Sequence, residues 1–256
     1  MKRIVTALLL IPFFCYIVLW APPWPFRVTV SAVAVLCFYE YSQLAALHGI
    51  AKPNVFGYAA GLLLLLLPGQ YGALFVLITI LAMSLALRSR EMSHALPDAA
   101  ALVLGVAYIF GSLRCAVELR VISAYWLFFA LSLNWAGDIA ALYVGRMFGR
   151  HKLAPEVSPG KSWEGSIGSA VASVIYGAIF FRWLLPAVPL AGALALTVVA
   201  NVAGQLGDLC ESAIKRGAGV KDSGNLLPGH GGWLDRVDSS LFALPVVYIV
   251  VSNLGW

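Results

Sequence analysis

The sequence predicts an all-α, polytopic integral membrane protein with about nine transmembrane helices and a cytosolic N-terminus. Of its 256 residues, 61% are hydrophobic and 11% are charged, whereas ordinary soluble chains carry about a quarter charged residues. The mean hydropathy is +0.87. Apolar runs of membrane-spanning length recur along the whole chain, and Lys and Arg gather on one side of them.

Nine apolar runs, each bounded by Pro, Gly or charged residues, are the candidate spans. They cover residues 4–21, 26–46, 54–68, 71–87, 97–114, 121–144, 165–185, 189–214 and 237–254. Only Pro68-Gly69-Gln70 separates the third from the fourth, so a re-entrant pair is the alternative for these two. The first run begins like a signal peptide, but no A-x-A cleavage site follows it, which favours an uncleaved span.

The distribution of basic residues supports this topology independently. A cytosolic N-terminus places thirteen of the seventeen Lys and Arg residues in cytosolic segments. The other four, Arg27, Arg114, Arg120 and Arg182, fall on the far side. This asymmetry agrees with the positive-inside rule, and it accounts for the net charge of +5 without a nucleic-acid partner.

We expect residues 1–120 to form a scaffold of N-terminal membrane helices and residues 121–256 to form the catalytic region. The catalytic region then has two cytosolic loops, at residues 145–164 and 215–236. The four cysteines lie in or beside apolar runs without a C-x-x-C pair, so neither a disulfide framework nor a zinc site is indicated.

The stretch from Gly207 to Ser240 carries most of the chemistry. Asp208, Glu211, Ser212 and Lys215 are spaced i, i+3, i+4 and i+7, which places them on one face of a helix. A glycine-rich, basic loop follows, and Asp235 and Asp238 open the next apolar run. Two carboxylate-bearing helices joined by such a loop can hold a divalent metal together with phosphate.

This stretch resembles the signature of the phosphatidate cytidylyltransferases, also called CDP-diacylglycerol synthases. The matching residues are Ser212, Lys215-Arg216, Lys221-Asp222, Pro228-Gly229-His230-Gly231-Gly232, Asp235-Arg236 and Asp238-Ser239. A second block, GRMFGRHKLAPEVSPGKSWEGSIG from Gly145 to Gly168, resembles the bacterial members. It departs from them at Gly160, where a basic residue is expected, and at Ser162, where Thr is usual.

Carboxylates within membrane spans are costly and are functional by default, which directs attention to Asp138, Asp208, Asp235 and Asp238. We predict that these four hold Mg²⁺, as one or two ions, because Mg²⁺ prefers hard oxygen ligands. The resemblance implies metal binding for Asp208, Asp235 and Asp238. The alternative is a set of structural ion pairs, such as Asp235 with Arg236 or Asp138 with Arg146.

The remaining candidates are grouped by the role expected of them. The predicted catalytic residues are Lys215, Arg216, Lys221, Asp222, Asp235 and Asp238. The predicted substrate-binding residues are Ser158, Lys161, Ser162, Glu164, Ser212, His230, Gly231, Gly232 and Arg236. The basic residues have snorkelling to the interface as their alternative role. Ser158 is expected to cap a helix whose first residue is Pro159, and that helix N-terminus is itself an anion site.

The resemblance implies that CTP and phosphatidic acid react to give CDP-diacylglycerol and pyrophosphate, with the active site facing the cytosol from the cell membrane. Membrane lipids and a homodimer partner are the other expected contacts. Two alternatives stay open. One is a transporter for an anionic solute, which intramembrane acids also fit. The other is a CTP-dependent lipid kinase, which needs similar phosphate and metal contacts.

Overall fold

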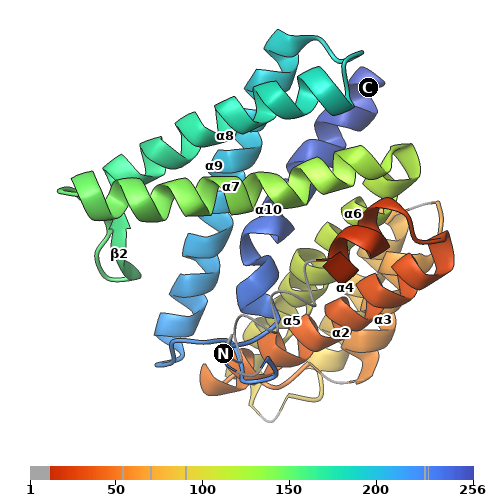
Figure 1. The fold of residues 1–256 in the computed structure, drawn as a ribbon. Helices are drawn as coiled ribbons and strands as arrows, with labels where there is room; N and C mark the ends of the chain where they lie inside the picture. Colours follow the sequence, from red (N-terminus) through yellow and green to blue (C-terminus); the bar gives the residue numbers. More distant parts are fainter. Residues whose placement is uncertain (1–11, 54, 70, 90, 228, 230) are drawn as a thin grey trace. The chain divides into compact units, whose positions relative to one another are not determined.

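The computed structural model is mostly helical (Figure 1) and describes residues 12–256, except residues 54, 70, 90, 228 and 230. The chain forms two compact units. Unit 1 holds residues 21–117 and 214–236, with the described part of the N-terminal segment up to Ile17. Unit 2 holds residues 18–20, 118–213 and 237–256.

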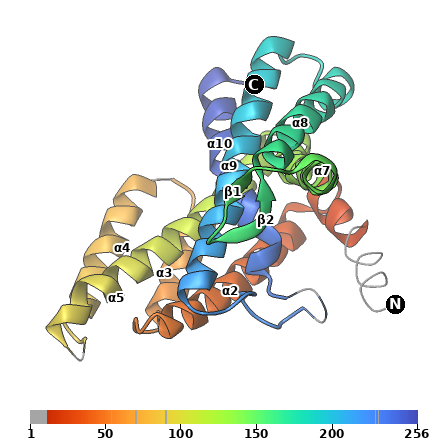
Figure 2. The same cartoon turned by 90° about the vertical axis from the view of Figure 1, so that its left-hand side faces the viewer.

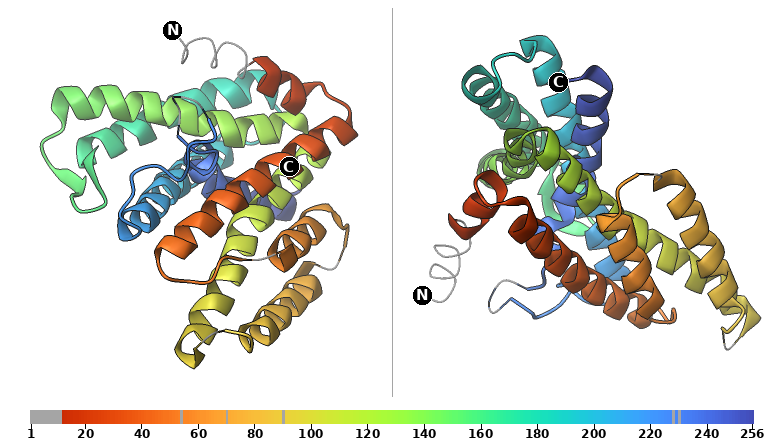
Figure 3. Two further views of the ribbon diagram at one scale, coloured as in Figure 1. Left: turned by 90° about the horizontal axis from the view of Figure 1, so that it is seen from below. Right: turned by 90° about the vertical axis from the view of Figure 1, so that its right-hand side faces the viewer.

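Unit 1 is built on α2 (Pro23–Leu47), α3 (Val55–Leu66), α4 (Tyr71–Ala86), α5 (Met92–Gly105), the π-helical segment η1 (Val106–Gly111) and the start of α6 (Ser112–Ile122). Figure 3 shows α3, α4 and α5, in orange to yellow, as neighbours. Phe38 of α2 lies at the centre, with its ring 5.2 Å from that of Phe110. Gly61 and Gly105 face this aromatic cluster, so α3 and α5 pack closely against it.

Unit 2 is built on α7 (Ala124–Phe148), α8 (Trp163–Leu184), α9 (Leu190–Gly217) and α10 (Leu234–Leu254). The last turn of α9 and the first residues of α10 belong to unit 1. Helices α7 and α8 lie side by side (Figure 1). The buried rings of Trp126, Phe129 and Phe181 form an aromatic core between them, with the Phe129 and Phe181 centroids 4.7 Å apart.

A ladder of polar side chains joins α8 to α9. The Asn201 amide nitrogen donates to the hydroxyls of Ser169 and Ser173, at 3.0 and 2.9 Å. The Gln205 amide nitrogen donates to the Asn201 side-chain oxygen at 2.7 Å, and the Ser166 hydroxyl donates to the Gln205 side-chain oxygen. In an apolar surrounding such hydrogen bonds fix the register between helices.

Each of the eight predicted spans from 26–46 to 237–254 is helical over most of its length. Among the described residues, six helices are long and apolar enough to cross a membrane: Pro23–Leu47, Met92–Ile122, Ala124–Phe148, Trp163–Leu184, Leu190–Gly217 and Leu234–Leu254. Helices α3 and α4, with 12 and 16 residues, are shorter. Residues 4–11 of the predicted span 4–21 lie outside the described residues, and residues 12–19 are helical. The protein is therefore a polytopic membrane protein, and nine spans stay a prediction.

The expectation of an all-α protein is wrong at one place. Strands β1 (Lys152–Ala154) and β2 (Ser158–Ser162) form an antiparallel hairpin between α7 and α8 (Figure 2). The predicted helix start at Ser158 and Pro159 is also wrong, because both residues lie in β2. Helix α8 begins at Trp163 instead, and the Ser162 hydroxyl caps it by accepting a hydrogen bond from the Gly165 backbone nitrogen at 3.1 Å.

Candidate functional site

One of the two acid–base clusters lies in unit 2, where the hairpin meets α9. Lys161, the last residue but one of β2, places its ammonium 2.6 Å from the Asp208 carboxylate. The Ser212 hydroxyl, one turn further along α9, donates to the other oxygen of Asp208 at 3.4 Å. Asp138 of α7 interacts electrostatically with both Lys161 and Asp208. The structure thus brings together four of the predicted site residues.

This Lys161–Asp208 cluster is accessible. The Lys161 and Asp208 side chains are 27% and 32% exposed, so a phosphate group or a metal ion can reach them. Because the pair is also in contact with solvent, its contribution to folding stability is small, about 0–1 kcal/mol. Either residue can therefore give up its contact with the other and bind a ligand at a small cost in free energy.

Asp238 lies on α10, which approaches α9 closely at Gly207 in unit 2. A Cβ atom on Gly207 would come within 2.7 Å of the Asp238 backbone oxygen, so α9 approaches α10 closely just before Asp208. Asp238 is 9% exposed, and one of its carboxylate oxygens accepts a hydrogen bond from the Ser239 backbone nitrogen at 2.8 Å. The glycine therefore sets how near the two carboxylate-bearing helices lie.

The other acid–base cluster lies in unit 1 and is buried. The Lys215 ammonium is 2.5 Å from the Asp235 carboxylate, with side chains 10% and 5% exposed. Asp235 also accepts hydrogen bonds from the Ser223 backbone nitrogen, at 3.0 and 3.2 Å, and from the Gly232 backbone nitrogen, at 2.8 Å. Asp235 therefore pairs with Lys215 and holds the glycine-rich loop, and the structural ion pair proposed from the sequence with Arg236 is not the one that forms.

Glu40 of α2 is a residue of this second cluster that the sequence analysis missed. It is buried, with 1% exposure, and its carboxylate accepts hydrogen bonds from the same loop. The signal was present in the sequence: Glu40 is a lone acid inside the predicted span 26–46, and acids in such positions are functional candidates by default.

The predicted charged residues of the loop other than Lys215 and Asp235 lie at its surface. The Arg216 guanidinium donates to the Val220 backbone oxygen at 2.9 Å, which closes the turn after α9. Lys221, Asp222 and Arg236 are exposed. Gly231 has a φ of 77°, a conformation that favours glycine, and it lies beside the Asp235 carboxylate. His230 lies outside the described residues.

Glu164, predicted to bind substrate, holds the base of the hairpin. One of its carboxylate oxygens is 2.6 Å from the His151 ring nitrogen. The carboxylate also accepts hydrogen bonds from the backbone nitrogens of Arg150 and His151, at 3.2–3.3 Å. Ser158 lies in β2, and the Lys152 ammonium donates across the hairpin to the Pro159 backbone oxygen at 2.7 Å. The hairpin is thus fixed at both ends.

The carboxylates differ in how well they fit a magnesium ion. In the part of the chain that the structure describes, no three acids, histidines or cysteines gather closely enough to form a finished metal site. Asp138 and Asp208 supply two carboxylates, and Mg²⁺ commonly uses one or two carboxylates together with the oxygens of a phosphate substrate. The accessible Lys161 ammonium lies beside Asp208, where it can contact that phosphate. Asp235 fits less well, because both of its oxygens already accept hydrogen bonds.

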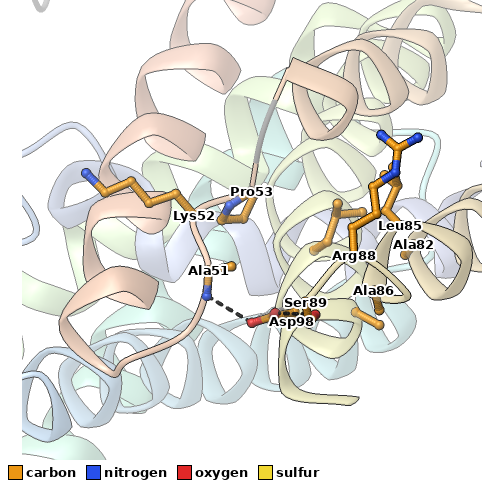
Figure 4. Close-up of a pocket in the computed structure, with 11 residues that line it drawn as sticks. Ala51, Lys52, Pro53, Ala82, Leu85, Ala86, Arg88, Ser89 and Asp98 are labelled. Carbon is orange, nitrogen blue, oxygen red and sulfur yellow. Dashed lines mark hydrogen bonds between the residues drawn. The ribbon is translucent and has the colours of Figure 1, made fainter. Parts of the chain in front are cut away.

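A pocket of about 180 Å³ lies elsewhere in unit 1 (Figure 4), between the connections that follow α2 and α4 and the side of α5. The Asp98 carboxylate joins these connections by accepting hydrogen bonds from the Ala51 backbone nitrogen at 2.9 Å and the Ser89 hydroxyl at 2.7 Å. Figure 4 shows the charged groups of Lys52 and Arg88 pointing away from each other, so they do not form a shared anion site.

Comparison with known proteins gives consistent matches. The model of the cytidylyltransferase family matches residues 1–254. A phosphatidate cytidylyltransferase of Bacillus subtilis (strain 168) is 32% identical over an alignment of 266 positions, which covers 98% of this chain and 97% of the relative. Phosphatidate cytidylyltransferases of Staphylococcus saprophyticus and Staphylococcus aureus (strain COL) are 34% and 33% identical, over 87% and 86% of this chain and 88% and 87% of theirs.

Proposed function

Because the chain belongs to the cytidylyltransferase family, we propose that it transfers the cytidylyl group of CTP to phosphatidic acid, giving CDP-diacylglycerol and pyrophosphate. The observation that carries this proposal is the family match, which extends over both acid–base clusters. The polytopic helical fold agrees with a substrate that resides in the membrane.

The reaction joins two polyanions. A phosphate oxygen of phosphatidic acid forms a bond to the α-phosphorus of CTP. The bond from that phosphorus to the oxygen bridging to the β-phosphorus breaks, and pyrophosphate leaves with the electron pair. The attacking oxygen is already ionised at neutral pH, so no general base is needed. The protein must instead offset the repulsion between the phosphates and align them.

We assign phosphate binding in unit 2 to Lys161, whose partly exposed ammonium is within reach of an incoming substrate. Asp138 and Asp208, with Asp238 as a further candidate, are the residues that would hold Mg²⁺. When bound, the ion would neutralise phosphate charge and polarise the phosphorus–oxygen bonds. Ser212 orients Asp208 through its hydrogen bond, and it is a positioning residue in this proposal.

We assign the buried Lys215 of unit 1 to the same chemistry. An ammonium with little solvent around it acts on a phosphate more strongly than one in water. Asp235 keeps the Lys215 side chain in one place, and the exposed Lys221 and Arg216 add positive charge along the loop. The loops at 145–164 and 215–236 face the cytosol in this proposal, since that is where CTP is found and where the basic residues concentrate.

The test uses purified full-length protein in mixed micelles of phosphatidic acid with Mg²⁺ and CTP. In one arm the α-phosphate of CTP is radioactive, and in the other the γ-phosphate is. We expect lipid label from the α-labelled CTP alone, together with release of pyrophosphate. Lipid label from the γ-labelled CTP would identify a lipid kinase. Uptake of CTP or phosphate into sealed vesicles without lipid label would identify a transporter.

A further inference from the structure

Glu40 holds the loop between α9 and α10 through three hydrogen bonds within unit 1. One carboxylate oxygen accepts from the Trp233 backbone nitrogen at 3.0 Å. The other accepts from the Leu234 backbone nitrogen at 2.8 Å and from the Ser223 hydroxyl at 3.1 Å. These contacts join the middle of the loop and its end to a residue of α2 that precedes them by 183 to 194 positions.

The loop backbone surrounds this carboxylate closely. A Cβ atom on Gly224 would lie 2.6 Å from one Glu40 oxygen, and a Cβ atom on Gly232 would lie 2.5 Å from the other. Both distances are shorter than real Cβ contacts. Gly224 and Gly232 therefore let the loop wrap around Glu40, and larger side chains at these two positions would push it away.

The surroundings of Glu40 suit a hydrogen-bond acceptor. Helix α10 begins at Leu234, so the Trp233 and Leu234 backbone nitrogens are among the donors that a helix N-terminus leaves unsatisfied. An acid placed there is stabilised by these donors and by the helix dipole. Glu40 thus does for α10 what a capping side chain normally does, but from α2.

Glu40 and Asp235 hold the same segment from two sides. Ser223 is bonded through its hydroxyl to Glu40 and through its backbone nitrogen to Asp235, which in turn pairs with Lys215. We infer that Glu40 is a positioning residue for the reaction: it fixes the loop so that Asp235 holds the Lys215 ammonium in place. This inference rests on the proposed function, because it gives Lys215 and the loop a role in phosphate transfer.

The test is Glu40→Gln, which keeps the shape of the side chain. One of the two carboxylate oxygens becomes an NH₂ group. This group then faces the backbone N–H of either Trp233 or Leu234, and two hydrogen-bond donors cannot bond to each other. We expect kcat to fall by about 10- to 100-fold, with the KM for phosphatidic acid changed by less than about threefold, because misplacing Lys215 weakens the transition state most. Glu40→Asp keeps the charge on a shorter arm and should recover part of kcat.

The matched control is Tyr41→Phe, on the next residue of α2. The Tyr41 hydroxyl is buried and donates to the Ala101 backbone oxygen at 2.9 Å, so its removal also deletes a buried hydrogen bond, but one that leads away from the loop. We expect Tyr41→Phe to change thermal stability about as much as Glu40→Gln does while leaving kcat within about twofold.

Amide hydrogen exchange supplies a readout that does not depend on turnover. In Glu40→Gln, peptides that cover residues 218–236 should exchange at least about tenfold faster, whereas in Tyr41→Phe they should not. Unchanged exchange in the loop, or equal losses of kcat in the two variants, would overturn the role of Glu40. If the wild type forms no labelled lipid while Glu40→Gln still exchanges faster in the loop, the proposed function is overturned and the attachment of the loop stands.

Discussion

Lys215 and Lys152 form a matched pair of lysines whose ammonium groups differ in burial. Lys215 is buried with Asp235, whereas Lys152 is exposed on β1 and donates to a backbone oxygen. We expect Lys215→Gln to lower kcat by about 100-fold or more at both low and high salt, since a site with little water screens poorly. Lys152→Gln should mainly weaken the use of dilute phosphatidic acid, and this deficit should shrink as salt rises.

Rates measured against the mole fraction of phosphatidic acid, at two salt concentrations, separate these outcomes. Equal and salt-sensitive losses in the two variants would show that Lys215 only attracts lipid headgroups. Lys152 falls within the predicted loop 145–164, but in the structure it is part of a strand and has a defined acceptor.

Asparagine variants of Asp208 and Asp235 distinguish a carboxylate that binds metal from one that holds the loop. In Asp208→Asn a ligand loses its charge, so the Mg²⁺ concentration needed for half-maximal rate should rise by about tenfold or more. In Asp235→Asn the loop loses its ion pair with Lys215, so the rate should fall at every Mg²⁺ concentration without rescue. The measurement is a magnesium titration of both variants. Rescue of Asp235→Asn by added Mg²⁺ would return that residue to the metal site.

The sequence predicted which residues carry charge in the two clusters, but not which of them pair. The structural alternative joined Asp235 to its neighbour Arg236, whereas the partner in the structure is Lys215, 20 positions earlier. A helical pattern places residues three or four positions apart on one face, but the path of a glycine-rich loop depends on backbone contacts that no periodicity records. Glu40 could have been singled out as a lone acid in a predicted span, but its partners could not be predicted, since they lie in that loop.

At the level of helices, the approach of α9 to α10 depends on Gly207. A Cβ atom there would lie 2.7 Å from the Asp238 backbone oxygen, and a backbone atom cannot turn aside as a side chain can. We expect Gly207→Ala to cost about 1–3 kcal/mol of stability. The variant should melt several degrees below the wild type in detergent and lose activity, because Asp208 and Asp238 move apart.

Gly72→Ala is the control for this substitution. Gly72 lies in α4, and a Cβ atom added to it would meet no other atom within 4 Å, so alanine should be neutral or stabilise the helix by up to about 1 kcal/mol. If the two variants melt at the same temperature, the close contact between α9 and α10 is not important for stability.

Long helices were predicted well because an apolar run of span length permits few other structures in a membrane. The region from Lys152 to Ser162 was predicted poorly. Its Ser158-Pro159 pair is typical of a helix start, but Gly145, Gly149 and Gly165 bring their segments close to the Ser162 hydroxyl. That packing favours Ser162 as the cap of α8, and the residues before it pair as a hairpin.

On the scale of the whole molecule, the number of crossings can be tested through the two ends of the last span. A reporter fused after Trp256 should lie outside the cytosol, because nine spans from a cytosolic N-terminus end on the far face. A reporter inserted at Gly219, an exposed turn residue with a φ of 71°, should lie in the cytosol. The accessibility of cysteines placed at these two positions to a membrane-impermeant thiol reagent gives the same information. Both reporters on one side would contradict the topology.

The bonds between Glu40 and the start of α10 have a consequence for biosynthesis. Glu40 and Trp233 are 193 positions apart, and at about 5–20 residues per second the ribosome needs roughly 10–40 s to make the second after the first. During that interval α2 has left the ribosome with an acid in its apolar stretch and without the amides that later surround it. Glu40 must therefore find other hydrogen-bond donors, such as water, until the final helix emerges, which makes docking of that helix a late step in the maturation of the first unit.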